Sequence, residues 1–273
     1  MLRWKEERQG ETALLIEGAR RIGKSTIVEE NKKNEYSSYI LVDFSKTASE
    51  INDLFNDLSD LNYIFLRLQL NYNVSLKERK SLIIFDEVQN NPKARQAIKH
   101  LVKDHRYDYI ETGSLISIRK NVQNIIIPSE ETRITMHPMD FEEFRWAMGD
   151  NVSFTLLKTV LEKKQPLGEA IHRKLMRDFR LYMLVGGMPQ AVDKYIKTND
   201  LSAVDTVKRD IIALYEEDLR KIDTSGKATA MFDAIPSQLS KNASRYTIST
   251  VIPGEKQDRV SDIIQLMEES RVT

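Results

Sequence analysis

The sequence contains no cysteine among its 273 residues. This absence excludes disulfide bonds, cysteine-ligated zinc and thiol catalysis, and it is typical of the reducing cytoplasm. No apolar run exceeds five residues, and residues 1–8 (MLRWKEER) have no apolar signal-peptide core, so we expect a cytoplasmic protein without membrane segments. The formal net charge is +0, because 41 Lys and Arg balance 41 Asp and Glu. Overall charge therefore provides no attraction to nucleic acid or anionic lipid.

Histidine is also scarce, and the four residues of this type are scattered without the spacing of a zinc site. The sequence also lacks the Gly-x-Ser-x-Gly elbow that would indicate a serine hydrolase. Hydrophobic residues make up 41% of the chain and charged residues 30%, which excludes a disordered chain and favours a soluble globular one. Because single cores seldom grow past ~250 residues, the length predicts about two domains.

Residues 1–150 alternate short apolar runs with helical stretches. The runs hold about four apolar residues between polar or glycine residues, which is typical of strands buried on both faces of a parallel sheet. We expect strands at 13–17, 38–43, 82–86, 107–111 and 133–136, and helices at about 24–33, 47–58 and 93–104. This is the βαβ pattern of an α/β domain with a parallel sheet flanked by helices.

The strand signal disappears after about residue 150. Helices are expected at 167–185, 190–198 and 201–222, so we assign 151–227 to an all-α lid domain. Three short helices, around 229–240, 246–252 and 258–269, suggest a helix-turn-helix or winged-helix unit at 228–273. That unit would be partial, because no wing strands follow, and we expect the chain to be a fragment. Its five basic and six acidic residues favour a structural or protein-contacting role over DNA binding.

The strongest motif fits G-x-x-x-x-G-K-[ST] and lies between the first predicted strand and the helix after it. Its glycines allow backbone turns that point successive N–H groups at a phosphate, and the helix N-terminus adds partial positive charge. Lys24 would bridge the β- and γ-phosphates, and the Ser25 hydroxyl would ligate Mg²⁺. The predicted nucleotide-binding residues are Gly18, Ala19, Arg20, Arg21, Ile22, Gly23, Lys24, Ser25 and Thr26.

Two carboxylates follow the apolar run at 82–85, where a buried parallel strand presents its end to ligand. Asp86 is expected to hold Mg²⁺ with Ser25, and Glu87 to polarise the attacking water. Solvated acids at a strand end are the alternative, which the phosphate loop upstream disfavours. Thr112, with Ser114 close behind, is a candidate sensor of the γ-phosphate at the end of the next strand, although an ordinary strand-to-turn transition also explains these residues.

Several arginines are candidates for stabilising charge in the transition state. They are Arg20, Arg21, Arg119 and Arg133, and the stripe Arg173, Arg177 and Arg180. The stripe lies on one helical face, which is either a solvated face with Glu169 as a partner or a lid face that presents an arginine to the phosphate. The sequence does not single out one of them.

These motifs together resemble prokaryotic AAA-type ATP-binding proteins. The resemblance rests on the loop at 18–26, on 86–89 (DEVQ) and 111–114 (ETGS), and continues through 137–144, 186–192 and 212–219. It implies a P-loop NTPase fold of the AAA/ASCE type, a helical and winged-helix region, and then a C-terminal domain of uncharacterised function, which is apparently missing here. It also implies that the Thr112 strand lies between the loop strand and the Asp86 strand.

The sequence therefore predicts a Mg²⁺-dependent ATPase, with Glu87, Lys24 and Thr112 as catalytic residues and Ser25 and Asp86 as metal ligands. The choice of ATP rests on the resemblance. The alternatives are a nucleotide-gated switch or scaffold with little turnover, and a nucleic-acid-dependent ATPase. An unknown protein client and an oligomer stay open as partners.

Overall fold

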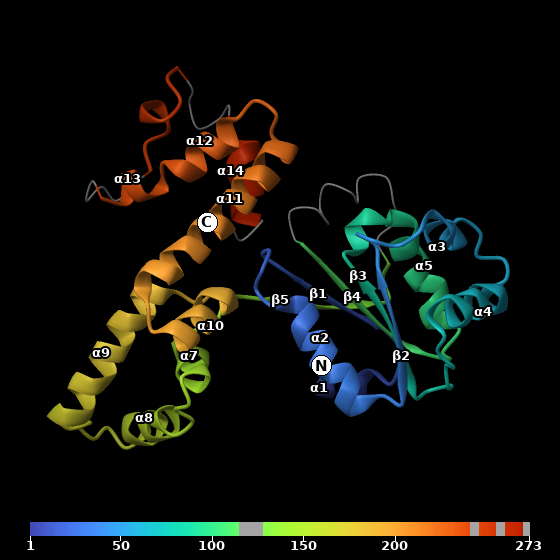
Figure 1. The fold of residues 1–273 in the computed structure, drawn as a ribbon, viewed down its shortest axis with the longest axis horizontal. Helices are drawn as coiled ribbons and strands as arrows, with labels where there is room; N and C mark the ends of the chain where they lie inside the picture. The colour runs from blue at the N-terminus through green and yellow to red at the C-terminus, as the bar shows by residue number, and fades with distance from the viewer. Residues whose placement is uncertain (115–127, 241–245, 255–259, 270–273) are drawn as a thin grey trace. The chain divides into compact units, whose positions relative to one another are not determined.

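The computed structural model describes residues 1–114, 128–240, 246–254 and 260–269 of the chain (Figure 1). Its contacts divide the chain into two compact units. One unit comprises Met1–Met136 together with Ile222–Thr273, and the other comprises His137–Lys221. The phosphate loop and both carboxylates at the end of the third strand belong to the first unit.

The first unit contains a five-stranded sheet in the order β2-β3-β4-β1-β5, in which every neighbouring pair is parallel. The strands are β1 (Ala13–Gly18), β2 (Ser38–Asp43), β3 (Ser81–Asp86), β4 (Asp108–Ser114) and β5 (Glu131–Met136). All five were predicted from the sequence, with ends that differ by up to three residues. The order confirms that the Thr112 strand, β4, lies between the loop strand β1 and the Asp86 strand β3.

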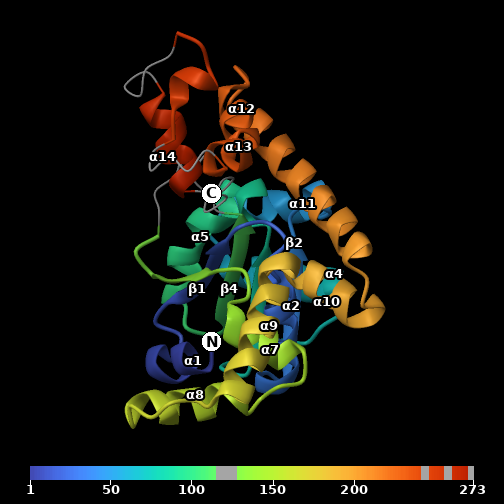
Figure 2. The same cartoon turned by 90° about the vertical axis from the view of Figure 1, so that its left-hand side faces the viewer.

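Helices cover both faces of this sheet, as its continuous apolar strands require. Leu82 and Ile84 of β3 pack into one cluster with Trp4 and Val28, while Ile83 and Phe85 pack into the cluster on the other face. The first face is covered by α1 (Leu2–Arg8) and α2 (Lys24–Glu35), the second by α3 (Ser49–Asn52), the 3-10 turn η1 (Asp53–Asn56), α4 (Leu61–Tyr72) and α5 (Pro92–Lys103). Figure 2 shows α2 and α5 on opposite sides of the strands.

Several helices of this unit differ from the sequence prediction, and α1 is one that was not predicted. The helix expected at 47–58 is split into α3 and the 3-10 turn η1, and both pieces bury one residue in the core, Ile51 and Phe55. Helix α4 was not predicted. Its residues are apolar on the buried side (Ile64, Phe65, Leu68) and also on the exposed side (Leu66, Leu70), so the 3.6-residue period that marks a surface helix is blurred.

The second unit is helical and has its own core. Its helices are α7 (Phe141–Ala147), α8 (Ser153–Glu162), α9 (Glu169–Val185), α10 (Pro189–Thr198) and most of α11 (Leu201–Ile222). Phe144, Val185, Val192 and Val204 form the buried cluster. The long helices agree with the stretches predicted at 167–185, 190–198 and 201–222.

The segment after α11 contains α12 (Lys227–Asp233), α13 (Ile235–Leu239), the 3-10 turn η3 (Ile248–Thr250) and α14 (Ser261–Glu269). No strand occurs in its described residues, and the helix predicted at 246–252 is reduced to the turn η3. The Gln238 side chain fixes that turn, since its amide donates to the Thr250 hydroxyl at 3.0 Å. The winged-helix assignment stays a prediction. Within the described residues, no helix has the length and apolar character needed to cross a bilayer.

Candidate nucleotide-binding site

The phosphate loop joins the end of β1 to the start of α2, as predicted. Gly18 has to be glycine, because an added Cβ would lie 2.4 Å from the Met136 carbonyl oxygen of the neighbouring strand. Arg21 and Gly23 both have positive φ angles, of 67° and 95°, in the left-handed region that lets a loop curl on itself. Gly23 is also the N-cap of α2 and makes no side-chain bond there. The helix thus begins with its amides directed toward the loop.

Lys24 is nearly buried and folds back over the loop. Its ammonium donates to the carbonyl oxygens of Ala19 at 2.8 Å and Gly18 at 3.2 Å. Burial lowers the pKa of Lys24, while the nearby carboxylates of Glu87 and Asp86 oppose that shift and Arg20 adds to it. The two predicted acids and Lys24 therefore share one electrostatic environment.

Asp86 is the point at which three elements meet. The Ser25 hydroxyl of α2 lies 3.1 Å from both carboxylate oxygens, and the Thr112 hydroxyl of β4 donates to Oδ1. The Asp86 side chain is itself almost fully buried. The sequence placed these three residues at one sheet edge, and the structure brings them into direct contact.

Glu87 follows Asp86 in the left-handed conformation, with φ 53° and ψ 44°. This conformation is uncommon for a residue with a side chain and turns the chain out of the strand. Its carboxylate accepts a hydrogen bond from the Gln89 side-chain amide. Gln89 lies in the 3-10 turn η2 (Val88–Asn90) and was not predicted as a site residue. The bond forms because the η2 turn brings the side chain of residue 89 back to that of residue 87.

The arginine candidates are placed differently from one another. Arg20 lies close enough to influence the pKa of Lys24. Arg133 pairs with Glu131 on its own strand at 3.3 Å. On β1 its partner in register is Leu15, which lies three residues before Gly18. Arg119 lies outside the described residues. Arg173, Arg177 and Arg180 belong to α9 in the other unit.

The donor set around Asp86 fits a magnesium ion. Mg²⁺ prefers oxygen ligands and is usually held by one or two protein groups together with phosphate and water. A buried carboxylate beside the Ser25 hydroxyl supplies two such oxygens. Among the residues that the structure describes, no group of three or more His, Cys, Asp or Glu side chains is arranged as a metal site. In the described part of this sheet edge, protein side chains alone therefore do not form a complete metal-binding site.

The parallel sheet and the phosphate loop between β1 and α2 have the arrangement of a P-loop domain. Consistent with this, residues 10–145 match the family model described as an AAA domain. Residues 10–145 therefore form an AAA-type P-loop domain, as the motifs predicted. Residues 176–273, which include part of the predicted lid and the predicted winged helix, match a model described as a domain of unknown function (DUF8612).

Two solved structures show limited similarity. The structure of the Aeropyrum pernix ORC1 protein in complex with DNA has a TM-score of 0.35 at 13% identity, over 98% of this chain and 82% of that one. The structure of C. elegans PCH-2 has a TM-score of 0.37 at 11% identity, over 74% of this chain and 62% of PCH-2. The match thus spans less than two thirds of PCH-2. No curated protein sequence matches the chain.

Proposed function

We propose that the chain binds ATP with Mg²⁺ at the phosphate loop and hydrolyses it. The observation that carries this proposal is the junction at Asp86, whose carboxylate accepts hydrogen bonds from Ser25 at the start of α2 and from Thr112 on β4. A buried acid that faces the first turn of the loop helix supports metal and phosphate binding at one place. The choice of ATP rests on the AAA class.

The loop amides and Lys24 hold the phosphates in this proposal. The ammonium exchanges its bonds to the Gly18 and Ala19 carbonyls for stronger bonds to phosphate oxygens. Ser25 and Asp86 hold Mg²⁺, which when bound neutralises charge on the phosphate groups. Thr112, which already contacts Asp86, senses the γ-phosphate from the central strand.

Glu87 orients the attacking water and accepts its proton. Its position one residue beyond Asp86, and its electrostatic influence on Lys24, support the role of a base beside the phosphates. The Gln89 amide restrains the carboxylate, so the orientation of Glu87 is set by η2. The helical lid at 151–227, the winged-helix segment at 228–273 and the cytoplasmic location are parts of this proposal that rest on the sequence.

Substitutions in the loop and at Glu87 test the two steps separately. We expect Lys24→Ala to weaken binding of a fluorescent ATP analogue by more than about tenfold, because charge-assisted bonds to phosphate are lost. We expect Glu87→Gln to bind the analogue normally but release phosphate ~10²–10⁴-fold more slowly. Lys33→Ala is the matched control, since Lys33 lies exposed on the same helix and pairs with Glu30. Normal turnover by Glu87→Gln would reject the assignment of Glu87 as the base.

A nucleotide-gated switch is the second candidate, and the bond between Gln89 and Glu87 favours it, because an engaged carboxylate is less available to water. Steady-state phosphate release separates the candidates. A wild-type rate equal to that of Glu87→Gln, with tight nucleotide binding, would identify a switch.

A further inference from the structure

Helix α4 presents an apolar surface to solvent as well as to the core. Ile64, Phe65 and Leu68 are buried against the sheet. On the opposite side, Tyr63, Leu66 and Leu70 follow an i, i+3, i+7 spacing and therefore share one face. These three side chains are 52%, 53% and 68% exposed. A surface helix normally carries charged residues there, but Arg67 is the one charged residue of α4.

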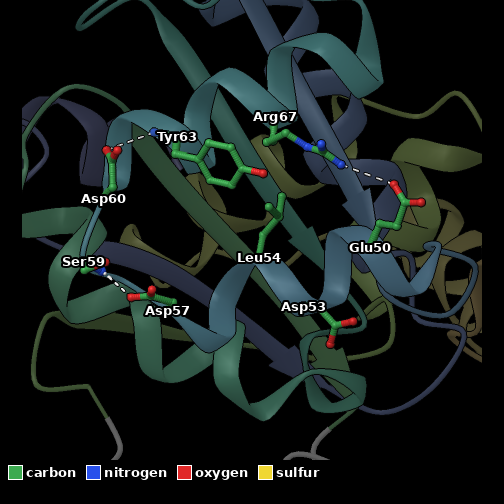
Figure 3. A pocket seen from close by; sticks show the side chains of 8 residues that line it. All are labelled: Glu50, Asp53, Leu54, Asp57, Ser59, Asp60, Tyr63 and Arg67. Atoms are coloured by element: carbon green, nitrogen blue, oxygen red, sulfur yellow. Dashed lines mark hydrogen bonds and ion pairs between the residues drawn. The ribbon is translucent and has the colours of Figure 1, made fainter.

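An acidic hollow lies beside this face (Figure 3). It has a volume of about 520 Å³ and is bounded by Tyr63 and Arg67 of α4 and by the segment from α3 to the start of α4. Four carboxylates line it, from Glu50, Asp53, Asp57 and Asp60, against the single guanidinium of Arg67. Arg67 pairs with Glu50 at 3.3 Å. The other three acids have no ion-pair partner among the described residues, so the hollow keeps an excess of negative charge.

Helix α9 in the other unit has the opposite character. Its buried side carries Leu175 and Val185. Met176, Met183 and Leu184 are on the exposed side, at 39%, 60% and 57% exposure. The stripe of Arg173, Arg177 and Arg180 lies on this same exposed side by its spacing. Arg173 is within 3.5 Å of Glu169 and Arg177 is 3.7 Å from Asp178, while Arg180 has no carboxylate partner within the described part of the chain.

We propose that the α4 face and its acidic hollow bind the basic, apolar face of α9 from a second copy of the chain. The charges are complementary, since three unpaired carboxylates would meet a row of arginines. The apolar rows also correspond, because Tyr63 to Leu70 and Met176 to Met183 are each seven residues apart, which is two helical turns or about 10 Å. The contact assigns the arginine stripe to assembly rather than to the γ-phosphate.

This contact joins different surfaces of the two copies, so it is heterologous: one copy retains a free α9 face and the other a free α4 face. The negative charge of the α4 face and the positive charge of the α9 face speed association and fix the register of the two helices, while the apolar rows supply most of the affinity. The association therefore weakens as salt increases, because exposed charges are screened within a Debye length of about 8 Å at physiological ionic strength.

Charge reversal and mixing test this proposal. For the wild-type chain, we expect the mass by sedimentation equilibrium to rise with concentration from that of one chain, 31.6 kDa, toward twice that value and beyond. Arg177→Glu with Arg180→Glu, and Asp53→Lys with Asp57→Lys, should each weaken association by at least about tenfold, since like charges then face each other. An equimolar mixture of the two variants should regain association, because both contacts again join opposite charges.

The controls separate this contact from nonspecific charge effects. Lys197→Glu with Arg209→Glu reverses two exposed charges on α10 and α11 and should associate like the wild type. Leu66→Ser with Leu70→Ser removes exposed apolar groups and should weaken association at any salt concentration. A wild-type chain that keeps the mass of one chain at every concentration overturns the proposal. So does a mixture of the two reversed variants that fails to associate.

Discussion

Glu111 is a buried acid in the centre of the sheet, one residue before Thr112 on β4. It lies near Glu131 of β5, which Arg95 of α5 contacts through two bonds of 3.2 Å. Among the residues that the structure describes, no donor reaches either oxygen of Glu111. Burial, followed by the Glu131 carboxylate, raises the pKa of Glu111 well above its usual value of 4.5. The folded protein therefore retains a proton that the unfolded chain releases.

This proton makes stability depend on pH. Below the unfolded pKa of Glu111, both states hold the proton, and the full stability is present. As the pH rises toward the folded pKa, the unfolded state alone ionises, and wild-type stability falls by up to about 1.4 kcal/mol per pH unit. We expect Glu111→Gln to gain stability relative to wild type as the pH rises from about 4 to 8.

Urea unfolding at a series of pH values measures this effect. Glu29→Gln, at an exposed position on α2, is the control and should follow the wild-type curve. A Glu111→Gln curve parallel to that of the wild type over this range would contradict the raised pKa.

At the scale of elements, Asn91 connects the turn after Glu87 to the helix that supports the sheet. Its side-chain oxygen caps α5 by accepting from the Ala94 amide at 3.0 Å, and its amide donates to the Asn52 carbonyl at 3.1 Å. The residue is buried, so both bonds replace water that is not available there. The side chain thus ties α5 to α3, while the backbone amide of Asn91 donates to the Val88 carbonyl of η2 at 3.0 Å.

Two substitutions at this position distinguish the cap from the second bond. We expect Asn91→Ala to lower the free energy of unfolding by about 1–3 kcal/mol, because it removes the cap and leaves the Asn52 carbonyl unpaired. Asn91→Asp keeps a capping oxygen and should fall between Ala and wild type. Urea midpoints measure both changes, and equal losses for the two variants would show that the cap contributes nothing.

At the scale of the whole molecule, the chain contains separate cores. The sheet packs its two faces in two clusters, whereas the unit His137–Lys221 closes around Phe144. The Phe144 ring lies 5.4 Å from that of Tyr182 and is 1% exposed. Local cores of this kind open as separate cooperative units.

Hydrogen exchange tests this separation. We expect Phe144→Ala to cost its own unit about 3–5 kcal/mol and to speed exchange of amides in 137–221 while β3 and β4 stay protected. Phe85→Ala, in the cluster on the α5 side of the sheet, should give the opposite pattern. Equal loss of protection across the chain for both variants would mean that the units unfold together.

The sequence by itself determined the parts of the site that depend on local spacing. The loop residues are consecutive, Asp86 ends an apolar run, and Thr112 lies near the end of the next predicted strand, so strand direction alone places them at one edge of a parallel sheet. Their contact at Asp86 follows from the order β3-β4-β1, which the resemblance to AAA-type proteins had implied.

Tertiary structure decided what depends on residues far apart in the chain. Glu111, Glu131 and Arg95 become neighbours through strand register and the packing of α5, and no local period encodes such a meeting. In the turn that ties Gln89 to Glu87, Glu87 adopts the left-handed conformation although it is not glycine. The amino-acid composition of this segment does not reveal such a turn. Helix α4 could not be predicted from the hydrophobic pattern, because both of its sides are apolar. Only packing against the sheet shows which side stays exposed to solvent or to a partner.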